Sequence, residues 1–185
     1  MIGKDMKKTA AMFVKMLKAI HFSVKRKIFF TKRKKGLKEK EIRTQPEKYG
    51  EENYYYIYGK NIDWKNPVLF DEKLTILKTG LYANNALVSQ CADKYRVREY
   101  VEECGLQHIL NELFDVWTDY REIDIAKLPD KFALKRNNDA GGVLIVQDKK
   151  QETQLKEKIE KLGKGTVRNY GLIFAEYQYQ HIEPC

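Results

Sequence analysis

The stretch LPDKFALKRNNDAGGVLIVQDKK, from Leu128 to Lys150, holds two short apolar runs on either side of a loop of polar and small residues. The runs KFALK and VLIVQD have the composition of strands, and RNNDAGG between them is rich in turn-forming residues. The stretch therefore predicts a β-hairpin with a lysine, Lys135, at the end of its first strand.

This hairpin has the parts of an anion site. Gly141 and Gly142 carry no side chain, so the backbone N–H groups of the loop can come close to a ligand. Lys135 adds a full positive charge at the same place. The loop is not a Walker motif, because its glycines follow the lysine and no G-K-[ST] sequence occurs in the chain. A plain surface hairpin uses the same turn residues, so that alternative stays open.

Helices are predicted on both sides of the hairpin. LFDEKLTILKTG has helical spacing and ends at Gly80, and QETQLKEKIEKLG, residues 151–163, predicts a helix that follows the hairpin. CADKYRVREYVEECG, residues 91–105, predicts one helix that ends at Gly105. Its predicted inward residues are Tyr95, Val97, Val101 and Cys104. HILNELFDVW reads as a strand or a short connector. The fold class expected is α+β, with helices followed by a small antiparallel sheet.

The positive charge is concentrated at the N-terminus. Residues 1–45 hold 15 Lys/Arg and 3 Asp/Glu, a net charge of +12, whereas the whole chain of 185 residues carries +9. Residues 46–185 are therefore slightly acidic, and the basic segment is an appendage to them. We expect residues 1–45 to form a basic amphipathic helix and a charged linker, and residues 46–185 to form the folded domain.

Within residues 6–30 an apolar stripe recurs at helical spacing, made of Phe13, Met16, Leu17, Ile20, Val24 and Ile28. Two interpretations stay open: the stripe packs on the body of the protein, or it lies on an anionic membrane with its lysines at the surface. Nucleic acid is a less favoured partner, because no aromatic residues interleave with the charges. The segment lacks the features of a signal peptide, so we expect a cytoplasmic protein, peripheral on the inner membrane face under the second interpretation.

Cysteine and histidine chemistry is not indicated. Cys91, Cys104 and Cys185 lack the close spacing of a zinc or redox motif, so reduced thiols are expected. The three histidines are far apart in sequence, and no metal site is predicted. No Ser/His/Asp or Cys/His arrangement is evident either.

Several segments in order resemble the N-terminal part of the TupA-like ATP-grasp family. They are YGKNIDWKNPVLFDEKLTILK, CADKYRVREYVEECG and EIDIAKLPDKFALKRNNDAGGVLIVQDK, followed by AEYQYQHIEP with Tyr177 at the place of a family tryptophan. The resemblance covers roughly residues 54–184. It implies an ATP-grasp-like N-terminal lobe and an ATP-dependent carboxylate–amine ligase that uses ATP and Mg²⁺ in bacterial cell-surface polysaccharide synthesis. Its implied partners are ATP and a polysaccharide or lipid-linked precursor.

The resemblance also assigns residues. Lys135 matches the strand-end lysine that contacts ATP phosphates, and Lys94 matches an earlier lysine aimed at the nucleotide. The flexible loop over the phosphates corresponds to Asn137, Asn138, Asp139, Ala140, Gly141 and Gly142. Asn138 stands where the family usually has histidine, so any role of that histidine is lost or altered. Another alignment would instead place Glu176 against adenine.

The family's metal-binding carboxylates come later than its Glu-Trp-like element. We therefore expect the second lobe and the Mg²⁺ ligands to be missing from this chain, which would then be a fragment or a shortened relative, not catalytic alone. The alternative is a non-catalytic binding module associated with polysaccharide-synthesis enzymes or the membrane. A glycosyltransferase accessory without a nucleotide role is less favoured.

Overall fold

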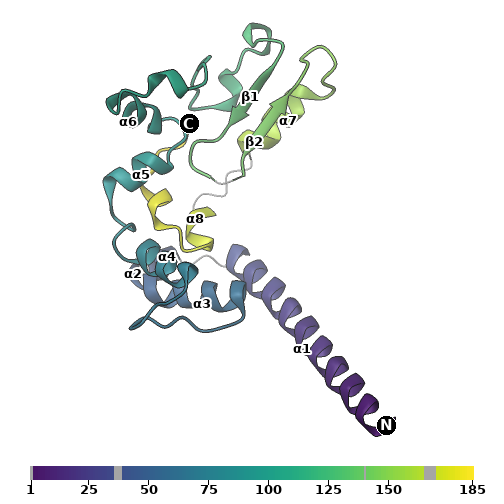
Figure 1. Ribbon diagram of the computed structural model, residues 1–185. Coiled ribbons are helices and arrows are strands. Elements are labelled where there is room, and N and C mark those ends of the chain that lie inside the picture. The colour runs from purple at the N-terminus through teal and green to yellow at the C-terminus, as the bar shows by residue number, and fades with distance from the viewer. Residues whose placement is uncertain (1, 36–38, 140, 165–169) are drawn as a thin grey trace. The chain divides into compact units, whose positions relative to one another are not determined.

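The computed structural model describes residues 2–35, 39–139, 141–164 and 170–185, as helices and one small sheet (Figure 1). By contacts the chain divides into two compact units, Met1–Ile76 and Leu77–Cys185. The α+β fold class is confirmed. The predicted boundary at residue 45 stays a prediction. None of the described helices is long and apolar enough to cross a membrane.

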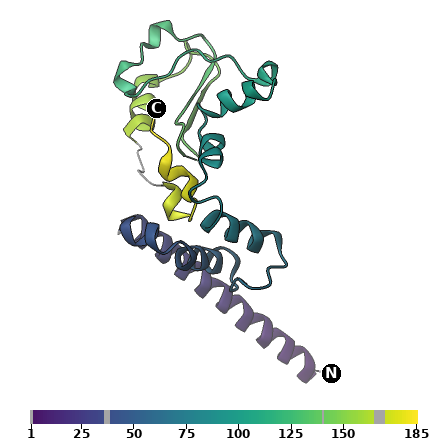
Figure 2. The same ribbon diagram turned by 90° about the vertical axis from the view of Figure 1, so that its left-hand side faces the viewer.

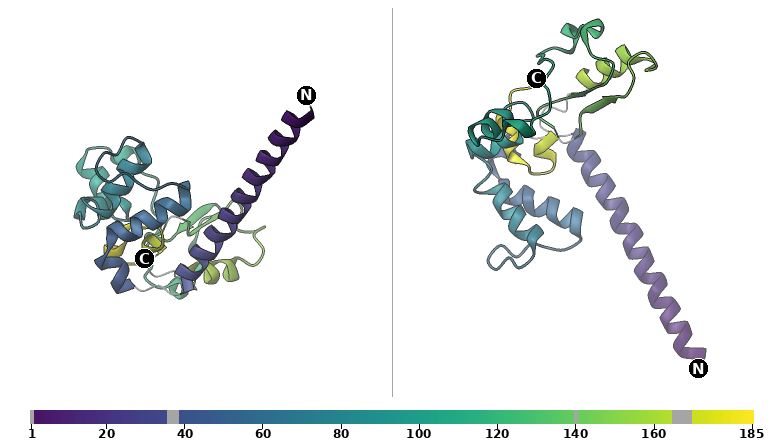
Figure 3. Two further views of the ribbon diagram at one scale, coloured as in Figure 1. Left: turned by 90° about the horizontal axis from the view of Figure 1, so that it is seen from below. Right: turned by 45° about the horizontal axis from the view of Figure 1, so that its top comes forward.

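The first unit is helical. Its helices are α1 (Ile2–Lys35), α2 (Glu39–Thr44), α3 (Pro46–Tyr58) and the beginning of α4 (Phe70–Thr79). α1 extends the predicted helix 6–30 in both directions and is one uninterrupted helix in both views of Figure 3. Residues 39–44, within the segment expected as a charged linker, form a short helix.

Local sequence fixes the ends of α3 and α4. Pro46 stands in the first turn of α3, where a missing N–H costs nothing, and Gly59 ends the helix with a left-handed φ of 73°. At the start of α4 the Glu72 carboxylate accepts the N–H groups of Val68 and Leu69, at 3.0 and 2.9 Å. This is one half of a capping box, and it sets the first residue of the helix.

The C-terminal half of α1 packs on α3. The ring of Phe29 stacks on Tyr56 with centroids 4.0 Å apart, and Phe22 meets Tyr55 edge to face at 5.8 Å. The buried Arg33 donates from Nη1 to Oδ1 of Asn53 at 2.8 Å. Aromatic contacts and a buried guanidinium therefore join these two helices.

The second unit contains the hairpin and short helices around it. Its elements are α5 (Ala86–Ala92), α6 (Val97–Glu103), η1 (Gln107–Ile109), η2 (Tyr120–Glu122), η3 (Ile125–Lys127), β1 (Phe132–Lys135), β2 (Val143–Val146), α7 (Leu155–Lys164), α8 (Tyr170–Ile173) and η4 (Tyr177–His181). β1 and β2 are antiparallel, with Phe132 opposite Val146 and Lys135 opposite Val143, and they run side by side in Figure 2. The predicted hairpin is confirmed.

The hairpin has one buried and one open face. On the buried face Phe132 and Val146 form a core cluster with Leu128 and with Leu155 and Ile159 of α7. Trp117 and Tyr120 pack against the same cluster. This arrangement confirms Leu155 and Ile159 of the predicted helix 151–163 as inward residues, although α7 begins only at Leu155.

The helix predicted over residues 91–105 was wrong in its extent, since two helices flank a turn there. Asp93 ends α5, and its carboxylate accepts the N–H groups of Tyr95 and Arg96 at 2.8 and 3.2 Å. An aspartate that bonds the backbone just after itself competes with a continuing helix. Tyr95 and Cys104, predicted inward, are exposed. Gly105 does end α6, with a left-handed φ of 73°.

Candidate anion-binding site

The loop between β1 and β2 is closed by its own aspartate. The Asp139 carboxylate, 5% exposed, accepts the backbone N–H of Gly141 at 3.0 Å and that of Gly142 at 2.5 Å. The guanidinium of Arg136 pairs with the same carboxylate. Two backbone amides and a guanidinium around one carboxylate form an anion-binding arrangement, with an internal anion in it.

Lys94 lies against this loop from the turn between α5 and α6. Its Nζ donates to the carbonyl oxygen of Arg136 at 2.9 Å and also to that of Asp139. The distance from Nζ to Oδ1 of Asp139 is 4.0 Å. The backbone N–H of Lys94 donates to the carbonyl of Asn137 at 3.2 Å. The lysine predicted from a distant part of the sequence therefore does meet the loop.

The charge of Lys94 is affected by these surroundings. Burial lowers the pKa of the Lys94 ammonium below its usual value, and the positive charges of Lys135 and Arg136 lower it further. The carboxylates of Asp139 and Asp93 act in the opposite direction but do not outweigh burial. Lys135 and Arg136 are thus near enough to Lys94 for their charges to affect its pKa, although burial is the larger cause.

Asn137 fixes the base of the loop. Its side chain, in a residue only 3% exposed, donates from Nδ2 to Oδ1 of Asp93 at 3.2 Å and to the carbonyl of Glu183 at 2.8 Å. Its Oδ1 accepts the N–H of Cys185 at 2.9 Å, and its own N–H donates to the carbonyl of Cys185 at 3.3 Å. Asn137 therefore has a structural role in joining three segments, and its amide atoms are fully engaged by the protein.

The other predicted site residues differ in exposure. Lys135, at the end of β1, is exposed and, within the described residues, forms no ion pair. Asn138 is half-buried and Gly141 is exposed, whereas Gly142 is buried. Ala140 lies outside the described residues. The structure thus brings Lys94 to the loop and leaves Lys135 facing solvent beside it.

Sequence reasoning missed the open face of the hairpin. Ala133, Lys135, Val143 and Ile145 share the face opposite the core, and Ile145 is 62% exposed. The run VLIV predicted a strand but did not indicate which of its faces is covered, because a continuous apolar run shows no alternation. Val143 and Ile145 thus leave apolar area exposed on the same face as Lys135.

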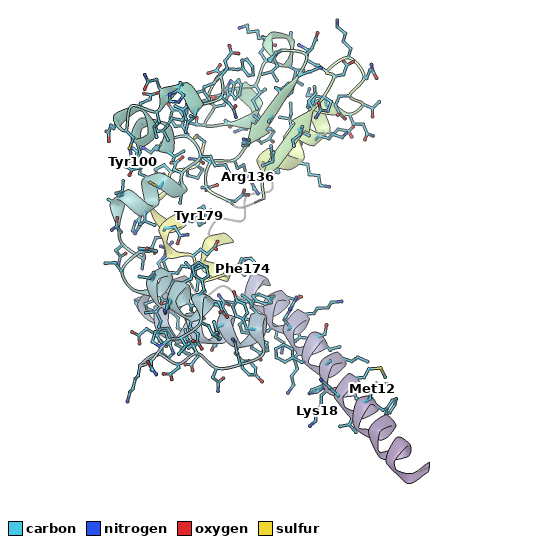
Figure 4. The ribbon with its side chains drawn as sticks, viewed as in Figure 1. Met12, Lys18, Tyr100, Arg136, Phe174 and Tyr179 are labelled. Carbon is cyan, nitrogen blue, oxygen red and sulfur yellow. The ribbon has the colours of Figure 1, made fainter. Side chains whose placement is uncertain are left out.

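Two further residues near the loop were not predicted. Arg136, labelled in Figure 4, pairs with Asp139 three residues later, and that spacing of opposite charges was the available signal. Tyr179 of η4 is close enough to Asp139 and Glu176 that their charges add to the effect of burial, which raises the pKa of its phenol. Glu176 itself receives a hydrogen bond from Lys78 at 3.0 Å.

Comparison with known protein families gives one finding. Residues 72–185 match the family model described as TupA-like ATPgrasp, which is more than half of the chain and includes the whole hairpin, Lys94 and the residues around Asn137. A comparison with curated proteins found no match, and a comparison with solved structures found none either.

Proposed function

Because the chain belongs to the TupA-like ATP-grasp family, we propose that the hairpin loop binds the phosphates of ATP in an ATP-dependent carboxylate–amine ligation. One observation carries the proposal. Lys94, Arg136 and the amides of Gly141 and Gly142 converge on one loop and already hold a carboxylate there. Groups that hold a carboxylate are also suited to a phosphate oxygen.

Lys135 and the open face of the hairpin extend this site. The ammonium of Lys135 is free to meet a phosphate without first breaking an ion pair to a described residue. Val143 and Ile145 offer apolar area beside it on the same face. We infer that the phosphates lie at the loop and that the rest of the nucleotide lies along this face.

The chemistry follows from charge. In the proposed ligation a substrate carboxylate attacks the γ-phosphorus of ATP, ADP leaves, and the resulting acyl-phosphate loses inorganic phosphate when an amine attacks its carbonyl carbon. The lysines neutralise the oxygens on which negative charge accumulates in the first step, and positioning supplies most of the remaining catalysis. We propose, from the family resemblance alone, a cell-surface polysaccharide or its lipid-linked precursor as the acceptor, with the reaction on the cytoplasmic side, where ATP is supplied.

Magnesium, when bound, would supply positive charge that offsets the negative charge of the phosphates. Among the residues that the structure describes, no three His, Cys, Asp or Glu side chains lie together so that they could hold a metal ion.

The test is ATP binding by isothermal titration calorimetry. We expect Lys135→Ala to weaken binding about tenfold or more, because a charge-assisted contact contributes about 1.5–3 kcal/mol. Lys131→Ala, at another exposed lysine next to the other end of β1, is the matched control and should leave the affinity unchanged. An equal loss of ATP affinity in both variants would show that net charge alone explains the effect, and it would contradict the proposal.

The pH dependence of the same titration tests Lys94. Deprotonation removes a positive charge from the site, so ATP affinity should fall as the pH rises through the lowered pKa of Lys94, below the usual lysine value of 10.5. In Lys94→Arg the cation persists, and the affinity should stay flat over that pH range. An identical decline in both proteins would assign the titration to another group.

A non-catalytic binding module is the second candidate, and one observation favours it. The donors of the loop are already engaged internally by Asp139 and by backbone carbonyls. ATP would have to displace Asp139, whereas a module that binds only another protein would not. If the wild-type chain shows no heat of binding with ATP while it remains folded, this second function is the better one.

A further inference from the structure

α1 carries an apolar stripe that its own unit does not cover. The stripe consists of Phe13, Met16, Leu17, Ile20, Val24 and Ile28, and each of these side chains is between 48% and 54% exposed. At a rise of about 1.5 Å per residue it runs for about 22 Å along the helix. The interpretation in which the stripe packs on the body of the protein is therefore wrong for the unit that contains α1.

Packing on α3 uses the other side of the same helix. Phe22, Phe29 and Arg33 make the contacts with α3 through Tyr55, Tyr56 and Asn53. At about 100° per residue these three positions lie nearly opposite the centre of the stripe. The contact with α3 thus fixes α1 to its unit and directs the stripe away from it.

The stripe has cations along both edges. At about 100° per residue, Lys27 lies at the Met16 edge of the stripe. Lys25 and Lys18 lie about 60° and 80° beyond Ile28 at the other edge. All three are exposed. In the part of α1 whose side chains the structure describes, none of the three forms an ion pair. Figure 4 shows Lys18 projecting from the helix into solvent. The sequence of α1 has twelve Lys/Arg and a single acidic residue, Asp5.

We propose that this face of α1 lies on an anionic lipid surface, with the stripe in the acyl boundary and Lys18, Lys25 and Lys27 at the headgroups. Apolar area and basic edges on one helix face are what such surfaces bind. A second copy of the chain fits less well, because it would bring two strongly positive helices together. Nucleic acid would leave the apolar stripe in water.

The test is co-sedimentation of the full chain with vesicles of phosphatidylcholine containing about 30% phosphatidylserine. The triple variant Leu17→Gln, Ile20→Gln, Val24→Gln should lower the partition coefficient at least about tenfold, because it removes apolar area from the stripe. Val68→Gln with Phe70→Gln is the matched control, since these side chains are 71% and 79% exposed outside α1. The control should bind as the wild type does.

Charge is tested separately. Lys18→Gln, Lys25→Gln, Lys27→Gln should lower binding at least about tenfold, as should about 0.5 M NaCl. Its control, Lys131→Gln, Lys150→Gln, Lys156→Gln, removes the same charge from exposed positions outside α1 and should bind normally. Equal loss in both triple variants would overturn the proposal, because net charge alone would then explain the binding.

Four other outcomes would also overturn it, and the first three concern the wild-type protein. They are equal binding to pure phosphatidylcholine, no pelleting of a protein whose helix content by circular dichroism is intact, and a stripe-dependent dimer in sedimentation equilibrium without vesicle binding. Retained binding in the stripe variant, at unchanged helix content, would do the same. The variants at Lys18, Lys25 and Lys27 keep the stripe and good helix formers, so they test the idea even if the glutamine stripe unfolds α1.

Discussion

The hairpin loop and α1 are both basic, yet they use their cations in opposite ways. Lys94 and Arg136 are partly buried, and carbonyls and a carboxylate within the protein accept their hydrogen bonds. Lys18 and Lys25 of α1 are exposed along a helix with almost no acidic residues. A cation with internal partners contributes to the fold, whereas a cation in water remains available to an external anion.

The variant with the largest expected effect is Asn137→Ala, which tests how much internal hydrogen bonds at the hairpin loop stabilise the fold. The change leaves the carbonyl of Glu183 and the N–H of Cys185 without their partner and removes a donor to Asp93. We expect a loss of about 3 kcal/mol in the free energy of unfolding, because each buried group left unpaired costs about 1–3 kcal/mol.

The measurement is urea unfolding followed by the fluorescence of Trp117, which packs on the core of the second unit, in a Trp64→Phe background. Asn138→Ala, one residue away and half-buried, is the control and should change stability by less than about 0.5 kcal/mol. Similar losses in the two variants would mean that the network around Asn137 does not stabilise the loop.

Gly142→Ala tests how tightly the loop closes on Asp139. A Cβ at this position would lie 2.7 and 2.9 Å from the two carboxylate oxygens of Asp139, too close for either to stay in place. We expect a loss of about 2 kcal/mol and weaker ATP binding, since overpacking a filled site costs about 1–3 kcal/mol.

Gly141→Ala provides the comparison for that variant. A Cβ at Gly141 meets no atom within 4 Å. Neither Gly141 nor Gly142 has a positive φ, so the backbone at both positions tolerates alanine. Its stability should stay within about 0.5 kcal/mol of the wild type. If Gly142→Ala proved equally neutral in the same urea titration, Asp139 would not be held as the structure describes.

Lys149→Ala extends the contrast to another internal cation. The Nζ of Lys149 donates to the carbonyls of Ile125 and Ala126, each at 3.3 Å, and also to that of Leu128. Its removal should cost about 1–2 kcal/mol, because three carbonyls lose a charged donor. Lys150→Ala, which breaks only the exposed pair with Asp130 at 3.8 Å, should cost less than about 0.5 kcal/mol by the same urea measurement.

The smallest expected effect lies in α1. Lys18→Gln with Lys25→Gln should change the thermal midpoint by less than about one degree, since exposed helix positions without partners contribute within about 0.5 kcal/mol. Differential scanning calorimetry of the full chain measures it. A large decrease would show that these lysines are internal cations after all, and the contrast between the two regions would be lost.

The hairpin was predictable because its signals are local. The strand composition of the two runs and the turn residues between them lie within about two dozen residues, as does Lys135 at the strand end. The exposure of Val143 and Ile145 was not predictable, because periodicity cannot tell which face of an apolar strand the fold leaves open.

Other features depended on side-chain contacts that no periodicity reveals. The break between α5 and α6 comes from the carboxylate of Asp93, which is only one residue in an otherwise helical pattern. The capture of the loop amides by Asp139, in place of an outside anion, required the folded loop to be seen. The path of α1 past α3 was similarly hidden, because both sides of α1 carry apolar residues.

The hydrogen bonds that join the Asn137 side chain to the backbone of Glu183 and Cys185 have a practical consequence for fusion proteins. A purification handle joined after Cys185 would start at the base of the hairpin loop, where an oligohistidine could compete with nucleotide. A handle placed before α1 would instead lie next to the helix that we propose binds lipid. Nucleotide titrations therefore suit an N-terminal handle, and vesicle experiments suit a C-terminal one.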